Sequence, residues 1–450
     1  MKRVSVLFLF VTSTLIGMRS ANAIDGRLKA YAESPQWRRL LHMGGTVARS
    51  KSRIEPGSGF FISNAGPRSP LSELEATIAA FENPESYLKK GRGHPYCLFP
   101  ARVKILERDL TIKIDKSVEC PNLDAWNRQL DVKEIAIVYA SQFVSNPASA
   151  MGHTLLKIVG KNRDDYLNVA LGYAADIDEK VGGFAYMWKG LFGGFDGIFS
   201  YSPYYEKVHE YNDMEKRDLW EFTLDLDSAR QRLLLDHLWE LMSNADIDYF
   251  FLDENCSYLT LAALEVVFPE RDFLTEFPVY LIPLESVKVL DAQGLVSSTT
   301  FRPSIQRKLK HKYGLLASDQ KKALLQSIEQ NSNSELTDPL SLETLLDYIS
   351  VQRQTGQGTL PEELVKLELE TFTKRSLAGQ YSHPAIPTPD SPLRSSGTYH
   401  LELGAGENRA NRNFIHLTFR PGVRQAMDVD TGYLPNSAFN FLQFELKHYG

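Results

Sequence analysis

The sequence FFLDENCSYLTLAALE, residues Phe250–Glu265, places a cysteine at the start of an apolar segment with helical spacing. After Cys256, apolar side chains recur at the period of a helix as far as Val267, which predicts a buried helix. Asn255 or Asp253 can cap this helix, so that Cys256 lies in its first turn. Because a helix N-terminus favours a thiolate, the segment predicts a nucleophilic cysteine.

The first residues of the chain have the pattern of an export signal. MKRVSVLFLFVTSTLIGMRSANA has two basic residues, an apolar run and a small-residue cleavage site, which predicts a signal peptide over 1–23. Later segments lack an uncharged apolar run long enough for a membrane helix. We therefore expect a periplasmic protein.

Composition restricts the class of protein further. A hydrophobic content of 43% and a charged content of 24% are those of an ordinary globular chain. The formal net charge of −6 argues against nucleic acid as a partner. The sequence lacks zinc-ligand and dinucleotide-binding motifs, so we expect neither a metal nor a cofactor.

The three cysteines predict one disulfide in an oxidising compartment. Cys97 and Cys120 lie close together in the sequence, and pairing them leaves Cys256 as a thiol. Three buried thiols are the alternative.

The spacing of apolar residues predicts an α+β fold. Strands are expected over 132–140, 153–160, 166–174 and 219–226, and a helix over 227–244. The segment from 381 to 396 is rich in proline and serine, and alternating strands follow it. We expect these parts: signal peptide 1–23, helical region 24–95, catalytic domain 96–300, helical region 301–380, linker 381–396 and β-strand-rich region 397–450.

Among the ten histidines, His153 is the candidate partner of the cysteine. It begins a predicted strand directly after a turn, at a sheet edge where loops can form a site. Asp253 and Glu254 disfavour a thiolate at Cys256, and a cationic imidazole would offset them. A lone histidine is, however, more often structural than catalytic.

The two segments have a counterpart in a known family. SNPASAMGHTLLKI (145–158) followed by FFLDENCSYLTLAALE resembles the Lnb N-terminal periplasmic domain family, named for a bacterial lipoprotein N-acyltransferase. The likeness extends over roughly residues 35–380. The order of the segments is also similar to permuted NlpC-type thiol enzymes, including lecithin:retinol acyltransferase.

The resemblance implies a permuted papain-like core, in which an antiparallel sheet and a catalytic helix are flanked by helical segments. It also implies that Cys256 attacks an ester or amide carbonyl while His153 transfers the proton, so that an acyl-thioester forms. The N–H of Cys256, at the helix start beside Asn255, is the expected oxyanion donor. Asn168, on the next predicted strand, is the candidate that orients the imidazole.

Residues 182–205 contain nine aromatic residues and six glycines, and a regular helix is not expected there. One interpretation is a mobile apolar wall for an acyl chain, and the other is a loop that packs its rings onto the core. The candidate wall residues are Trp188, Phe192, Phe195 and Phe199.

We therefore expect an exported cysteine-dependent acyl transferase that acts on a lipid or a lipidated protein. A membrane surface is a further candidate partner, reached through the C-terminal β region. A cysteine amidase or peptidase of the cell envelope is an alternative, because the same dyad supports both reactions. A non-enzymatic envelope scaffold with a buried Cys256 is the second alternative.

Overall fold

The computed structural model describes most of the chain after the predicted signal peptide. The described residues are 26–45, 50–88, 91, 93–142, 151–177, 181–277, 280–355, 359–382, 385–397, 399–407, 409, 412–421, 423–424, 439–440 and 443–449. The predicted signal peptide and most of the turn before His153 lie outside these residues.

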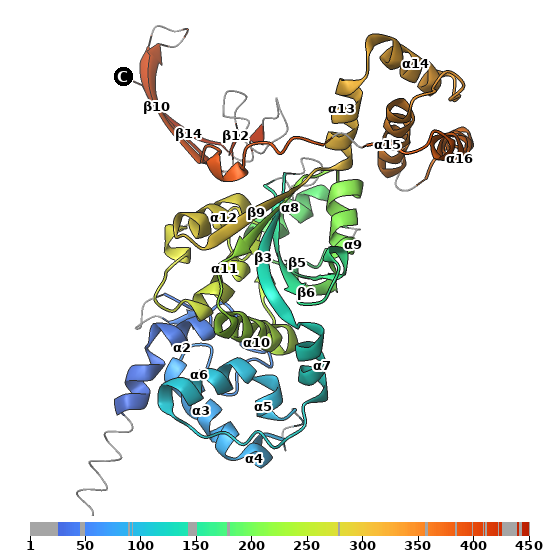
Figure 1. Ribbon diagram of the computed structural model, residues 1–450. Coiled ribbons are helices and arrows are strands. Elements are labelled where there is room, and N and C mark those ends of the chain that lie inside the picture. The colour runs from blue at the N-terminus through green and yellow to red at the C-terminus, as the bar shows by residue number, and fades with distance from the viewer. Residues whose placement is uncertain are drawn as a thin grey trace, which may run out of the picture. The chain divides into compact units, whose positions relative to one another are not determined.

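The chain has a mixed α+β fold with a central antiparallel sheet (Figure 1). The sheet has the strand order β8-β6-β5-β4-β3-β7-β9. Its strands are β3 (Val132–Ala140), β4 (His153–Gly160), β5 (Val169–Ala175), β6 (Phe195–Pro203), β7 (Leu219–Leu224), β8 (Asp248–Tyr249) and β9 (Val296–Arg302). The predicted α+β class is confirmed, whereas the permuted papain-like core stays a prediction.

The chain divides into two compact units, each built from separate stretches. The first unit contains Met1–Asp131, Tyr173–Phe199 and Leu226–Tyr280. The second contains Val132–Gly172, Ser200–Asp225 and Leu281–Gly450. The domain limits predicted from the sequence stay predictions.

The first unit is mainly helical. Its helices are α2 (Pro35–Leu40), α3 (Pro70–Glu82), α4 (Pro84–Leu88), α5 (Pro95–Leu98), α6 (Pro100–Leu110), α7 (Pro121–Gln129), α8 (Gly183–Phe192), α10 (Ser228–Asn244) and α11 (Cys256–Val267). Local signals start several of them: Ser34, Ser69 and Asp227 accept hydrogen bonds from N–H groups of the first turn. A short hairpin, β1 (Met43–Gly44) with β2 (Lys51–Ser52), also belongs to this unit.

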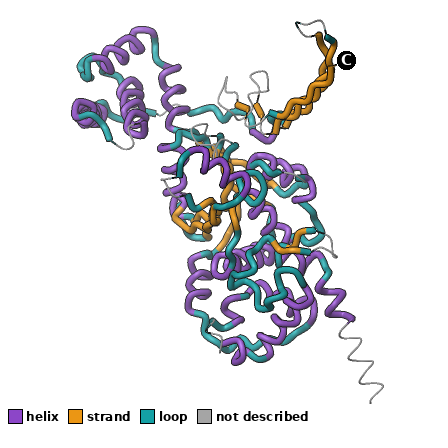
Figure 2. The backbone as a smooth tube through the Cα atoms, turned by 180° about the vertical axis from the view of Figure 1, so that it is seen from behind, coloured by secondary structure: helices purple, strands orange, loops and turns teal. Residues whose placement is uncertain are grey.

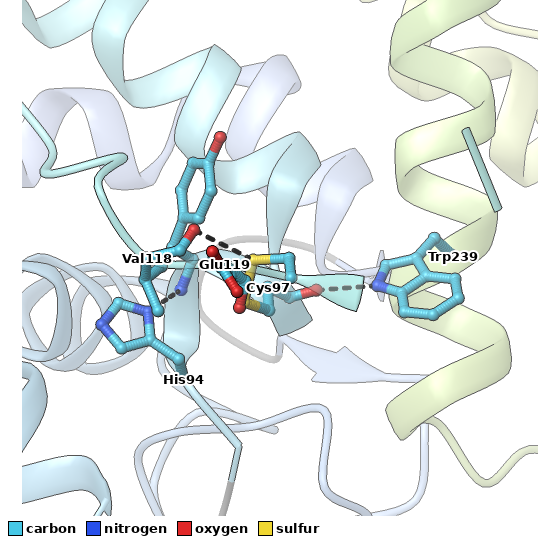
Figure 3. Close-up of a disulfide and its surroundings, with 7 residues drawn as sticks. His94, Cys97, Val118, Glu119 and Trp239 are labelled. Atoms are coloured by element: carbon cyan, nitrogen blue, oxygen red, sulfur yellow. Dashed lines mark hydrogen bonds between the residues drawn. A yellow bond between two sulfur atoms is a disulfide. The ribbon is translucent and has the colours of Figure 1, made fainter. Parts of the chain in front are cut away.

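The predicted disulfide between Cys97 and Cys120 is present (Figure 3). Its Cα atoms are 5.4 Å apart, and the carbonyl of Cys97 accepts a hydrogen bond of 2.9 Å from the indole of Trp239. The disulfide therefore ties α5 to the chain before α7. The hydrogen bond from Trp239 ties the Cys97 backbone to α10.

Replacement of Cys97 and Cys120 by serine should lower the free energy of unfolding by about 3 kcal/mol, because the bridge restricts the unfolded chain. Urea denaturation measures this loss. Intact-mass analysis after alkylation without reductant should find one reactive thiol, and three modified thiols would contradict the bridge.

The aromatic segment 182–205 corrects the expectation of an irregular loop. Residues 183–192 form α8 and residues 195–203 form β6. The glycines lie mainly at the ends of α8, where they do not interrupt it. The exceptions are Gly197, which lies in β6, and Gly190 of α8, where a Cβ atom would lie 2.2 Å from the ring of Phe251. The glycine at 190 lets the Phe251 ring pack against the helix.

The second unit contains the strands that the sequence predicts best. β3 and β4 have the predicted limits, and they pair from Val132↔Gly160 to Ala140↔His153. β5 begins at Val169, because a 3-10 turn occupies Asp165–Leu167. The other helices of this unit are α9 (Tyr204–Val208), a π-helical turn (His209–Met214) and α12 (Pro283–Ala292).

The remainder of the second unit is helical and then β-structured (Figure 2). The helices are α13 (Ile305–Leu315), α14 (Ser318–Glu329), α15 (Pro339–Thr355) and α16 (Glu362–Leu377). The strands β10 (Tyr399–Glu407), β11 (Asn413–Pro421) and β14 (Phe444–Tyr449) form a separate three-stranded antiparallel sheet. The predicted strand-rich C-terminal region is therefore present.

Candidate functional site

Cys256 is the first residue of α11, as the sequence predicts. The Asn255 side chain caps the helix by accepting hydrogen bonds from the N–H groups of Ser257 (3.0 Å) and Tyr258 (3.1 Å). Its amide donates to the Phe251 carbonyl at 3.2 Å and so fixes the preceding loop. Cys256 is 2% exposed. The cap therefore holds the thiol at the positive end of a helix dipole.

Tyr249 of β8 is the partner of Cys256 within the first unit. Its oxygen accepts a hydrogen bond from the Cys256 N–H, and its hydroxyl is hydrogen-bonded to the Cys256 thiol. Burial raises the pKa of Tyr249 well above its ordinary value, so this phenol stays protonated. The neighbouring Tyr173 donates to the Ile247 carbonyl at 2.9 Å and so supports β8. A neutral donor therefore faces the sulfur.

Arg53 neutralises the acids that precede the cysteine. Its guanidinium pairs with Asp253 at 3.3 Å and also with Glu254. Burial raises the pKa of Glu254, and the charge of Arg53 opposes that increase. Two carboxylates that disfavour a thiolate are therefore matched by a cation from a distant segment of the chain.

A cavity of about 750 Å³ lies beside the loop that leads to Cys256, the 250–254 loop. Its apolar lining includes Leu191, Phe192, Phe250 and Leu252. Its charged lining is made by Lys51, Arg53, Glu55, Asp248, Asp253 and Glu254. The cavity therefore suits a ligand with both apolar and charged parts.

His153 lies in the second unit, at the start of β4. Gly152 precedes it with a φ of +98°, and a Cβ atom at this position would lie 2.5 Å from the ring of Tyr139. A glycine is therefore required where the chain enters the strand. The His153 ring is half-buried and lies 6.0 Å from the Tyr211 ring, measured between centroids.

Arg217 and Tyr211 support this part of the second unit, and the sequence gives no local signal for either role. Arg217 is buried and donates to the carbonyls of Ala140 (2.9 Å) and Ser141 (2.5 Å). Its guanidinium also lies 4.9 Å from the centre of the Tyr211 ring. Since Ala140 pairs with His153, Arg217 fixes the strand end that faces the histidine.

Asn168 does not occupy the position expected of an imidazole partner. Its side-chain oxygen accepts a hydrogen bond from Gly160 at 3.0 Å, at the opposite end of β4 from His153. Its amide donates to Asp165 at 3.3 Å. A strand of eight residues separates its two ends by about 23 Å, so Asn168 stabilises the 160–168 turn instead.

The four candidate wall residues differ in exposure. Trp188 and Phe192 are 57% and 65% exposed, and their ring centroids are 4.5 Å apart. Phe199 is half-buried and lies 5.1 Å from the Tyr173 ring. Phe195 is 2% exposed and stacks on Phe251, so it belongs to the core rather than to a wall.

One known family matches a stretch of the chain that contains both candidate catalytic residues. Residues 122–293 match the sequence model of the Lnb N-terminal periplasmic domain. These residues belong to the Lnb N-terminal periplasmic domain family. The match is shorter than the likeness expected over 35–380: residues 29–109 match a separate domain of unknown function, DUF7843, and neither family model covers 294–380. Arg53 lies in this second domain.

The family and the disulfide bear on the compartment of the protein. No curated protein and no solved structure matches the chain significantly. The Cys97–Cys120 bridge is consistent with export to an oxidising compartment. Within the described part of the chain, we find no helix that is both long and apolar enough to span a bilayer.

Proposed function

We propose that this protein is a cysteine-dependent acyl transferase of the cell envelope, with Cys256 as nucleophile and His153 as general base. The observation that carries the proposal is Cys256 itself. It is a buried thiol at the capped start of α11, hydrogen-bonded by Tyr249, within a family domain that also contains His153. A purely structural cysteine needs neither the capped helix start nor the phenol.

The proposed reaction has two steps. In the first, the Cys256 sulfur attacks an ester carbonyl, the bond from the acyl carbon to oxygen breaks, and the alcohol leaves with the proton that His153 took from the thiol. In the second, an acceptor attacks the thioester, loses its proton to His153 and releases the thiol. The N–H of Cys256, which now bonds the Tyr249 oxygen, stays the expected oxyanion donor.

Mass spectrometry of Cys256 tests this proposal. The intact protein is incubated with phospholipid vesicles or with a diacylated lipopeptide, and the Cys256 peptide is then examined for an added acyl group. The proposal expects a thioester that hydroxylamine removes. An unmodified Cys256 with both lipids, together with unchanged lipids, would contradict it.

A cysteine amidase or peptidase is the second candidate, and the lining of the cavity favours it. Six charged residues line the cavity beside the 250–254 loop, and a peptide would find polar partners there. Equal turnover of a water-soluble peptide and of a diacylated lipopeptide would favour this candidate over the transferase.

The exposed rings of α8 provide a test of the lipid substrate. Replacing Trp188 or Phe192 by serine should change the free energy of unfolding by less than about 1 kcal/mol, because both rings are exposed. Turnover of a long-chain donor should fall roughly tenfold relative to a short-chain donor, since an apolar side chain contributes about 1.5–3 kcal/mol when it is buried by a ligand.

Phe195 supplies the matched control for these variants. It is a buried ring of the same segment, so its replacement by serine should cost about 3–5 kcal/mol of stability. Chemical denaturation and turnover of both donors measure the two effects. An equal loss with long and short donors in the Phe192 variant would contradict a role of this ring in chain binding.

A further inference from the structure

We propose that the domain of unknown function at residues 29–109 positions the nucleophile helix, and that Arg53 is its positioning residue for Cys256. This inference rests on the proposed role of Cys256. It assigns a task to a domain that contains neither of the candidate catalytic residues.

The domain holds the C-terminal end of α11. The buried Gln36 of α2 donates a hydrogen bond of 2.9 Å to the Val266 carbonyl, and Arg39 donates one of 3.0 Å to the Phe268 carbonyl. The last carbonyls of a helix have no partner within the helix. Two side chains of α2 therefore satisfy carbonyls at the end of the helix that carries Cys256.

The same domain also holds the N-terminal end of α11. Arg53 follows the β1–β2 hairpin and pairs with Asp253 and Glu254, the acids directly before Asn255. Its guanidinium lies 5.9 Å from the ring centre of Tyr258, in the first turn of α11. Arg53 therefore contacts the chain on both sides of Cys256.

The backbone beside Arg53 is fixed as well. The N–H of Glu55 donates to the Asp246 carbonyl at 2.8 Å, and Ser52 pairs with Met43 in the hairpin. Arg53 is thus held between two anchored positions, and its placement does not depend on its own ion pairs alone. Glu254 has only 10% of its side chain exposed, so its charge needs a partner.

The charges around the thiol make Arg53 important for its reactivity. The titratable groups around this part of the first unit are Glu55, Asp196, Asp248, Asp253, Glu254, Glu265, Tyr173, Tyr249, Tyr258, Lys51 and Arg53. The carboxylates disfavour a thiolate at Cys256. Arg53 neutralises Asp253 and Glu254, the two carboxylates nearest to Cys256 in the sequence. Loss of Arg53 should therefore make the thiol harder to ionise.

The test is the pH profile of Cys256 alkylation by iodoacetamide in the intact, disulfide-bonded chain. In Arg53→Gln the midpoint should move up by about one pH unit, because the carboxylates of Asp253 and Glu254 lose the cation that pairs with them and then disfavour the thiolate more strongly. Alkylation at pH 7 should be about tenfold slower than in the wild type. Arg53→Lys keeps the charge, and its midpoint should lie between those of the wild type and of Arg53→Gln.

Two further variants separate positioning from general damage. Arg53→Gln/Glu254→Gln should return the midpoint towards the wild-type value, because it removes the unbalanced carboxylate. Arg38→Gln is the matched control, since Arg38 belongs to the same domain but pairs with Glu33 and Ser50. Its profile should equal that of the wild type.

Alkylation needs no acyl substrate, so the outcome is independent of the acyl transfer reaction. An unchanged midpoint in Arg53→Gln, or an equal shift in Arg38→Gln, would overturn the positioning role. A wild-type Cys256 that resists alkylation between about pH 6 and pH 9 would overturn it too, because a positioned nucleophile must ionise in this range. A shift in Arg53→Gln without any acyl transfer by the wild type would leave the positioning role and remove the proposed function.

Discussion

Replacement of Cys256 by alanine should abolish acyl transfer, with a loss of at least about 10³-fold in turnover, because no covalent intermediate can form. Replacement of His153 by alanine should cause a loss of about 10²–10⁴-fold, which is the usual contribution of a general base. Transfer of a labelled acyl group to an amine acceptor measures both effects. These are the largest changes in activity that we expect.

The control is His209→Ala in the second unit. His209 is exposed and pairs with Asp213 at 3.1 Å, so its loss should alter neither activity nor stability. The thermal unfolding of all three variants should stay close to that of the wild type. If His153→Ala keeps more than about half of the wild-type turnover, the proposed dyad is wrong.

Local sequence signals predict the elements that carry Cys256 and His153. Alternating and continuous apolar runs give the limits of β3 and β4 without error, because both strands are buried. The cap at Asn255 is equally local, since its amide bonds N–H groups two and three residues later. The disulfide follows from the short separation of Cys97 and Cys120.

The structure of residues 182–205 differs from the prediction because the position of each residue matters there more than the composition of the segment. The glycine content of 182–205 argues against a helix, yet most of these glycines lie outside α8. Phe195 belongs to a strand, and its ring points into the core, whereas Phe192 ends the helix and is exposed. A count of aromatic residues cannot separate these two environments.

The partners of the cysteine could not be found from the sequence, because they are distant in it. Arg53 lies about two hundred residues before Glu254, and only the folded chain brings the pair together. Tyr249 is closer, but the short β8 strand that orients it has no recognisable pattern. The sequence predicts Asn168 within a strand, but β5 begins one residue later, and Asn168 ends the 3-10 turn before it.

Arg102 is the residue of the first unit whose loss should cost the most stability. Its side chain and that of Glu73 are 0% exposed, and the two are paired at 2.5 Å. Glu73 also accepts hydrogen bonds from the N–H groups of Ile62 and Ser63. Burial raises the pKa of the nearby Glu240 to about 8, so this second carboxyl is largely protonated at pH 7. Glu73 is thus the nearer carboxylate that balances Arg102, while Glu240 lies 3.7 Å from the guanidinium.

Arg102→Met should lower the free energy of unfolding by about 3–5 kcal/mol at neutral pH, because Glu73 becomes a buried charge without a cation. Methionine keeps an apolar stem between the rings of Phe60 and Phe99, which lie 4.6 and 4.3 Å from the guanidinium carbon. The loss should therefore be electrostatic and depend on pH. Burial raises the pKa of Glu73 above its ordinary value, although the charge of Arg102 opposes this increase. Without Arg102, the pKa of Glu73 in the folded protein should lie further above its pKa in the unfolded chain.

A carboxyl with a raised folded-state pKa stabilises the fold at low pH, and this contribution is lost as the pH rises. The cost of Arg102→Met should therefore be small near pH 5 and grow towards pH 8, by at most about 1.4 kcal/mol for each pH unit. Urea denaturation at several pH values measures this slope. Arg102→Met/Glu73→Gln removes the carboxyl of Glu73, so its destabilisation relative to the wild type should grow less with pH than that of Arg102→Met. If the cost of the single variant is the same at pH 5 and pH 8, it comes from packing, and the charge balance around Glu73 does not hold the first unit together.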